Sequence, residues 1–90
     1  MAAGTFVKDS DAVLDYTVNW ADWLGVDTIS SSSWTVPTGL TEDSDSNTDQ
    51  TATVWLSGGT VGQTYEVVNS IVTAAGREDD RTIVIRVEEK

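Results

Sequence analysis

The most constraining feature of this sequence is the alternation of apolar and polar residues over several short segments. From residue 14 to residue 18, Leu14, Tyr16 and Val18 share one face of an extended chain, with polar side chains between them. Successive side chains of a strand point to opposite faces, so a period of two predicts strands with one buried face. The pattern returns in residues 51–57, 64–73 and 82–88.

A weaker strand pattern covers residues 27–36, which are β-rich at both ends with four serines between them. The serine run indicates either a flat, polar strand or a bulge, because Ile29 and Trp34 fall on opposite faces of the strand unless it slips by one residue. Pro37 ends the strand because it cannot donate to a ladder. Residues 39–41 begin a short edge strand, and the very polar residues 42–50 are expected to form a loop.

Residues 19–25 predict a single turn of helix, packed on the end of a sheet by its tryptophans. Asn19 is a good N-cap, Trp20 and Trp23 are spaced to share a helical face, and Gly25 is a plausible stop.

These elements predict an all-β chain of 90 residues with one core. Five strand patterns and one or two weaker ones, separated by Gly, Ser and Asp turns, favour an immunoglobulin-like antiparallel β-sandwich as a single domain over residues 1–90. A small barrel is the runner-up. Residues 1–8 are a candidate flexible N-terminal arm.

Charge and composition exclude several classes of function. Five Lys and Arg against fifteen Asp and Glu give a net charge of 5 − 15 = −10, which disfavours nucleic acid and anionic membranes as partners. The chain has no cysteine and no histidine, so thiolate chemistry and the commonest general base are missing. No secretory signal or membrane-length apolar run is present. We expect no cofactor, no catalysis and synthesis in a cytoplasm.

Two segments carry a family resemblance: residues 14–24 (LDYTVNWADWL) and residues 56–67 (LSGGTVGQTYEV), each followed by shorter matching pieces. Together they resemble the small bacteriophage proteins described as fiber-tail adaptors, over nearly the whole chain from residue 7 to residue 88. The resemblance implies an immunoglobulin-like virion structural protein, present in multiple copies, that attaches a tail or receptor-binding fiber to the tail or connector through contacts with other virion proteins.

The second segment also has a structural interpretation. Gly58, Gly59 and Gly62 are suited to tight turns that lead into the strand at Tyr65. Tyr65 is similar to a tyrosine corner, whose hydroxyl bonds back to nearby backbone. The inter-sheet cysteine pair of antibody domains is absent, so the likeness is to the sandwich and not to antibody domains.

A candidate metal site lies in the polar segment, where Asp43, Asp45, Asn47 and Asp49 place an oxygen ligand at every second position. Calcium prefers such ligands, but the glycine and the glutamate of an EF-hand loop are missing. A solvated acidic loop is the main interpretation and a calcium site the alternative.

The tryptophans are the candidates for partner contacts. Trp34 is expected in the core, whereas Trp20 and Trp23 either cover an open end of the sandwich or contact a partner. Trp55 alternates with buried positions and follows Thr53, so it is expected to point outward as a docking residue.

Three functions follow from the sequence. The first is the fiber adaptor in the virion. The second is a capsid decoration or head-fiber module, and the third is a carbohydrate- or surface-binding domain that stacks an aromatic patch on sugar rings.

Overall fold

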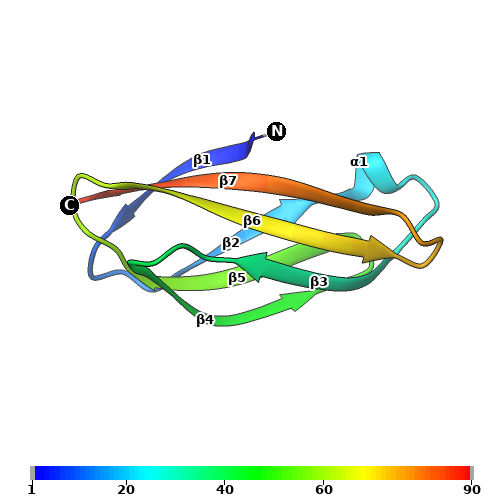
Figure 1. Cartoon of the computed structure of the whole chain (residues 1–90), viewed down its shortest axis with the longest axis horizontal. Helices are drawn as coiled ribbons and strands as arrows, with labels where there is room; N and C mark the ends of the chain where they lie inside the picture. Colours follow the sequence, from blue (N-terminus) through cyan, green and yellow to red (C-terminus); the bar gives the residue numbers. More distant parts are fainter. Residues whose placement is uncertain (1, 90) are drawn as a thin grey trace.

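The structure, a computed structural model, describes residues 2–89 as two β-sheets packed face to face (Figure 1). In chain order the elements are β1 (Ala2–Asp9), β2 (Leu14–Asn19), α1 (Ala21–Leu24), β3 (Ile29–Thr35), β4 (Leu40–Asn47), β5 (Thr51–Gly58), β6 (Thr64–Thr73) and β7 (Glu78–Glu88). One sheet has the order β1-β7-β6-β3 and the other the order β2-β5-β4. The predicted all-β sandwich is therefore confirmed.

The strand pairings differ from the expected antiparallel sandwich in one place. Four of the five pairs are antiparallel, but β1 runs parallel to β7, with Phe6 beside Ile85 and Lys8 beside Val87. Parallel neighbours need a long connection, and β1 and β7 are the first and last strands of the chain, so the other elements provide that connection.

β1 also covers the segment that the sequence left as a candidate flexible arm. Residues 2–8 lie in a paired strand, and Met1 lies outside the described residues. The Phe6 ring packs on Tyr16 at 5.1 Å between centroids. The sequence did not predict this strand because its apolar residues do not alternate with polar ones, and its pairing depends on β7, which is distant in sequence.

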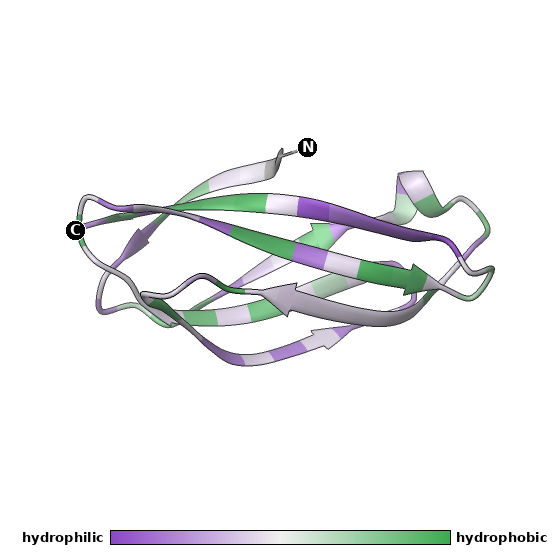
Figure 2. Ribbon diagram, in the orientation of Figure 1, coloured by the Kyte–Doolittle hydropathy of each residue, from purple (hydrophilic) through white to green (hydrophobic). Residues whose placement is uncertain are grey.

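The core lies between the sheets and is formed by the inward positions of the alternating strands. Figure 2 shows apolar (green) stretches along strands of both sheets. β6 is a central strand, as predicted, and its bounds match the predicted residues 64–73. Ile83, Ile85 and Val87 of β7 are buried, as their alternation indicated. The fully buried apolar side chains also include Val54, Leu56 and Val67.

β3 contains the bulge that was one of the two interpretations of the serine run. Its register with β6 shifts between Ile29 and Ser31, which places Ile29 and Trp34 on the core side of the strand. α1 follows the prediction with one difference, because Trp20 occupies the N-cap and the Asn19 side chain accepts a hydrogen bond from the Ala21 N–H. Gly25 ends the turn with a φ of 62°.

The loop predicted for residues 42–50 is wrong for most of its length. Residues 40–47 form β4, the outer strand of its sheet, paired with β5 through a register shift between Glu42 and Ser44. All side chains after Leu40 in this strand are exposed. Backbone pairing at a sheet edge does not require apolar side chains. The polarity of residues 42–47 therefore indicated correctly that they are exposed, but it did not indicate that they form a loop. Likewise, β7 begins at Glu78, so the connection predicted for residues 74–80 is shorter.

Candidate docking surface

The outward side of the β2-β5-β4 sheet carries the surface that the sequence singled out. Trp55, in the central strand, has Asp15 of β2 on one side and Ser44 of β4 on the other. Thr53 lies between Thr17 and Ser46 in the same way. Cross-strand partners share a face, so these six residues form one surface, which we call the Trp55 face.

Trp55 is the only aromatic residue on this face. Its side chain is 41% exposed, whereas its neighbours Val54 and Leu56 are fully buried on the opposite side. Thr53 is half-buried, and its hydroxyl shares a 2.9 Å hydrogen bond with that of Thr17. The Trp55 face is thus a polar sheet surface with one indole on it.

Trp20 is buried and cannot contact a partner, so the prediction of a partner contact is wrong for this residue. It is fully buried, and its Nε1 donates to Asn69 Oδ1 at 2.9 Å. Its ring meets Trp23 edge-on at 5.3 Å between centroids. Trp20 therefore closes one end of the sandwich, which was the other interpretation of its sequence position.

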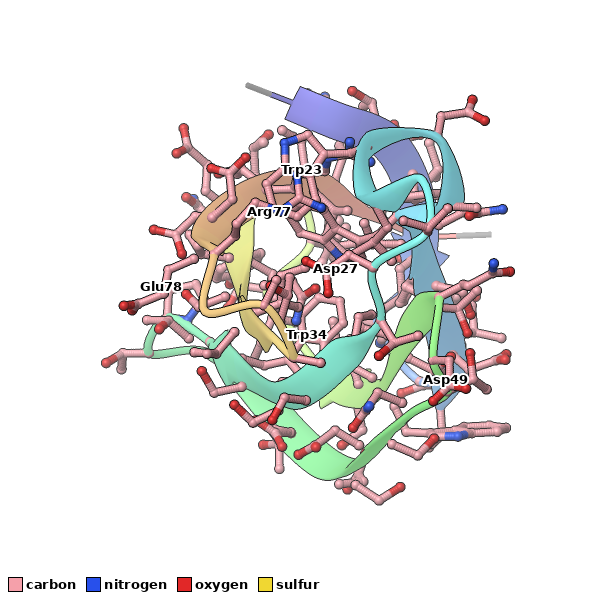
Figure 3. The ribbon with its side chains drawn as sticks, turned by 90° about the vertical axis from the view of Figure 1, so that its right-hand side faces the viewer. Trp23, Asp27, Trp34, Asp49, Arg77 and Glu78 are labelled. Atoms are coloured by element: carbon pink, nitrogen blue, oxygen red, sulfur yellow. The ribbon has the colours of Figure 1, made fainter. Side chains whose placement is uncertain are left out.

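Trp23 is half-buried and covered by an arginine at the same end (Figure 3). The Arg77 guanidinium lies 4.3 Å from the centre of the Trp23 ring, and its Nε is 3.1 Å from Asp27 Oδ2. Arg77 also donates from Nη2 to the Leu24 carbonyl. The Thr73 side chain, the Thr28 and Ala75 N–H groups and Arg77 all bond to Asp27 and lower its pKa to about 2. This cluster holds α1 on the sheet.

The cations of the described residues are all engaged within the chain. Arg81 lies 4.2 Å from the centre of the Trp20 ring and donates to the Asn19 carbonyl, and Arg86 pairs with Glu88 at 2.8 Å. Lys8 is fully buried, with Nζ donating to the carbonyls of Asp9 and Gly58, and burial lowers its pKa. The surface of residues 2–89 is therefore dominated by carboxylates.

The glycines of the second segment lie at the end of β5 and in its connection to β6. Gly58, Gly59 and Gly62 all have positive φ. A Cβ on Gly59 would lie 2.6 Å from Val87 Cγ2, so this position combines a left-handed backbone with no space for a side chain. The Thr60 N–H donates to Tyr65 Oη at 2.9 Å, which is the bond that a tyrosine corner makes to nearby backbone.

Trp34 packs against the core from β3 and is partly buried. Its Nε1 is buried and has no hydrogen-bond partner among the described residues. Figure 3 shows it between the two sheets, below the cluster of Trp23, Asp27 and Arg77.

The calcium candidates are spread along a strand and a turn. Asp43, Asp45 and Asn47 lie in β4, and Asp49 follows it. Within residues 2–89 no three acidic side chains come together in a metal-binding group. A different pair does meet: Glu42 bonds to the side chain of Asp45, which raises the pKa of Glu42 to about 7. Calcium binding stays a prediction.

Several structural residues were missed by sequence reasoning. Asn69 occupies an inward position of β6 between Val67 and Ile71, and this polar residue in an apolar series was the available signal. Arg77 and Arg81 stack on Trp23 and Trp20. The similar spacing of the two arginines and the two tryptophans in the sequence was a weaker signal for this pairing. No signal marked Glu42 and Asp45 as partners, because a bulge brings them to one side.

Comparison with known proteins agrees with this architecture. The structure is similar to the one described as "Solution structure of the PKD domain from KIAA 1837 protein", with a TM-score of 0.58 and 19% identity, covering 100% of this chain and 83% of that one. At this identity the likeness shows the fold alone, and the predicted immunoglobulin-like sandwich is confirmed.

No curated protein matches the chain. None of the helices formed by residues 2–89 has the length and apolarity to cross a membrane. A family model does match, over residues 8–86, and its description is "Podophage GP4 fiber-tail adaptor protein gp77". The match covers most of the sequence, from the end of β1 to a point two residues before the end of β7. The chain therefore belongs to this podophage fiber-tail adaptor family.

Proposed function

We propose that this protein is a non-enzymatic adaptor in the virion that attaches a tail or receptor-binding fiber to the tail or connector, docking through the Trp55 face. The observation that carries the proposal is the 41% exposed indole on the central strand of a polar sheet surface. Tryptophan is enriched among residues that dominate binding energies. The family description supports the adaptor role.

The charge distribution supports a protein partner with a basic surface. The described cations are engaged within the chain, so the carboxylates dominate the field that an approaching partner meets. Complementary charge accelerates encounter and selects the correct partner. The same field repels nucleic acid.

The experiment measures binding of the purified chain to the fiber subunit and to the tail or connector subunit of its virion. Trp55→Ala is expected to weaken one of these complexes by about thirtyfold or more, the loss typical of a central anchor. Val72→Ala is the matched control, since Val72 is an exposed apolar residue on the other sheet. Unchanged affinity of Trp55→Ala for both subunits, with the control also unchanged, contradicts docking through this face.

A carbohydrate-binding function is the second candidate, and one observation favours it. Trp55 is flanked on the same face by the Asp15 carboxylate and the Ser44 hydroxyl, an arrangement that suits stacking of a sugar ring with hydrogen bonds at its rim. A glycan array separates the two candidates, because Trp55-dependent binding of glycans is expected only for the carbohydrate-binding function. A capsid decoration or head-fiber role is separated by electron microscopy, which locates the protein on the head or the tail.

A further inference from the structure

We propose that the free edge of β2 accepts an extended, basic segment of a partner protein as an added strand. The inference rests on the proposed docking function and adds to it a second contact and the chemistry of the partner. Strand addition supplies affinity from backbone hydrogen bonds and specificity from alternate side chains.

The unpaired backbone groups of β2 can be identified from its register. The Trp20 N–H donates to the Gln50 carbonyl at 2.8 Å, which makes this pair a hydrogen-bonded one. In an antiparallel ladder such pairs involve every second residue, so Leu14, Tyr16 and Val18 bond to β5. The intervening residues, Asp15, Thr17 and Asn19, point their backbone groups away from β5. Of these groups, the Asn19 carbonyl is taken by Arg81.

β2 differs from the other three outer strands of the sandwich, which are β1, β3 and β4. Each of those three has a register shift in its pairing, and β4 also carries Glu42 and Asp45 opposite buried residues of β5. Bulges and inward charges are the devices that prevent unwanted strand pairing. β2 pairs with β5 over six residues without a shift, so it is the regular edge among the described strands.

Uncovered apolar surface lies beside this edge. Leu14 is on the inward side of β2 with Tyr16, yet it is 40% exposed, and the preceding Val13 is 54% exposed. An added strand would cover these two aliphatic side chains.

The charges near β2 select the partner. Asp11 lies just before the strand, Asp15 within it and Asp22 just after it, all exposed. A second copy of this chain, with a net charge of −10, would bring like charges together at its own β2 edge. A segment with Lys or Arg at alternate positions would instead place its cations opposite these carboxylates.

The test uses a random short-peptide display library selected on the immobilised full chain, followed by synthesis of the selected peptides. We expect the selected peptides to be rich in Lys or Arg and in β-branched residues. Hydrogen exchange by NMR should show that they slow exchange of the Asp15 and Thr17 amides. Salt should weaken their binding, as expected for charge complementarity.

Two pairs of variants locate the contact. Thr17→Pro removes an outward N–H that β5 does not use, and we expect it to lower peptide affinity by about tenfold or more. Thr17→Val keeps that N–H while losing the same hydroxyl, and should bind within about twofold of the wild type. Asp15→Lys should weaken binding severalfold, whereas Glu66→Lys, an exposed charge reversal on the other sheet, should not. Urea unfolding verifies that each variant is folded.

Four results overturn the proposal: selection of no binding peptide, selection of peptides without excess positive charge, equal binding by Thr17→Pro and the wild type, or concentration-dependent protection of the Asp15 and Thr17 amides without peptide. The last result would indicate pairing between copies. Trp55→Ala separates this inference from the proposed docking face, because it should leave peptide binding at β2 unchanged even if it abolishes binding of the virion subunits.

Discussion

Trp20 Nε1 donates a 2.9 Å hydrogen bond to Asn69 Oδ1 in the interior of the sandwich, where both side chains are fully buried. The amide nitrogen of Asn69 donates in turn to Ser32 Oγ at 2.9 Å and to the Ser33 carbonyl at 3.0 Å. One side chain on the central strand β6 thereby connects the residue that precedes α1 to the outer strand β3. A buried polar group with all its partners fixes one arrangement of these elements.

Replacing Asn69 by leucine tests this connection. Leucine has the same branched skeleton as asparagine but is bulkier and cannot form hydrogen bonds. The change leaves the buried Trp20 N–H without its acceptor and removes the bonds to Ser32 and Ser33, so we expect a loss of about 2–4 kcal/mol in the free energy of unfolding. Urea denaturation measures it. Ser32→Ala, which removes one acceptor at the half-buried end of the network, should cost only about 0.5–1.5 kcal/mol. Equal stability of Asn69→Leu and the wild type would show that the network contributes nothing.

The connection between β5 and β6 predicts a contrast between two glycines. Gly59→Ala adds a Cβ at 2.6 Å from Val87 Cγ2 at a φ of 99°, so strain and overlap together should cost about 2–4 kcal/mol. Gly62→Ala has a similar φ of 88° and open space around the new Cβ, so only the strain applies, about 1 kcal/mol. Thermal unfolding of the two variants measures the difference. Equal melting temperatures would contradict the close packing of Gly59 on Val87.

Sequence reasoning succeeded where one strand's own pattern decides its structure. β6 and the inward residues of β7 alternate strongly, and the mismatch between Ile29 and Trp34 pointed to a bulge, which β3 contains, as one of two interpretations. It failed for β1 and β4, whose pairing depends on partner strands and not on their own side chains. A polar edge strand and a polar loop look the same in sequence.

The candidate site follows the same division. The outward direction of Trp55 is a local consequence of alternation in β5, and the structure places it there. The burial of Trp20 depends on Asn69, which lies forty-nine positions away in the sequence. The regularity of the β2 edge appears only when its register is compared with those of the other outer strands.

Because the pKa of Asp27 is lowered, we expect the free energy of unfolding to fall in acid. Its folded pKa of about 2 lies below the ordinary value of 3.8, so the unfolded chain binds more protons between these values. Its stabilising contribution is therefore complete above about pH 4 and is lost as the pH falls toward 2. Thr73→Val, which removes the largest cause of the shift, should raise the Asp27 pKa more than Arg77→Lys does. Carboxyl NMR titration measures both pKa values, and Arg86→Lys, at the separate ion pair with Glu88, should leave Asp27 unchanged.

Because the pKa of Glu42 is raised, we expect the free energy of unfolding to depend on pH with the opposite sign near neutrality. Its bond to Asp45 raises its pKa to about 7 from an ordinary 4.5, so the folded chain binds more protons between these values. Stability should therefore fall as the pH rises from about 4.5 to 7 and then level off. Because the side chain is exposed, solvent screening should limit the effect to about 0.5–1 kcal/mol.

Glu42→Gln removes this titration. It should be close to neutral for stability at pH 4, where Glu42 is protonated, and should stabilise the protein at pH 8, where two carboxylates otherwise face each other across the bulge of β4. Asp43→Asn is the matched control, because it removes a neighbouring charge without touching the pair. Urea unfolding of both variants at the two pH values measures the effect. If Glu42→Gln and Asp43→Asn gain the same stability at pH 8, general relief of negative charge is the cause and the shared proton between Glu42 and Asp45 is not.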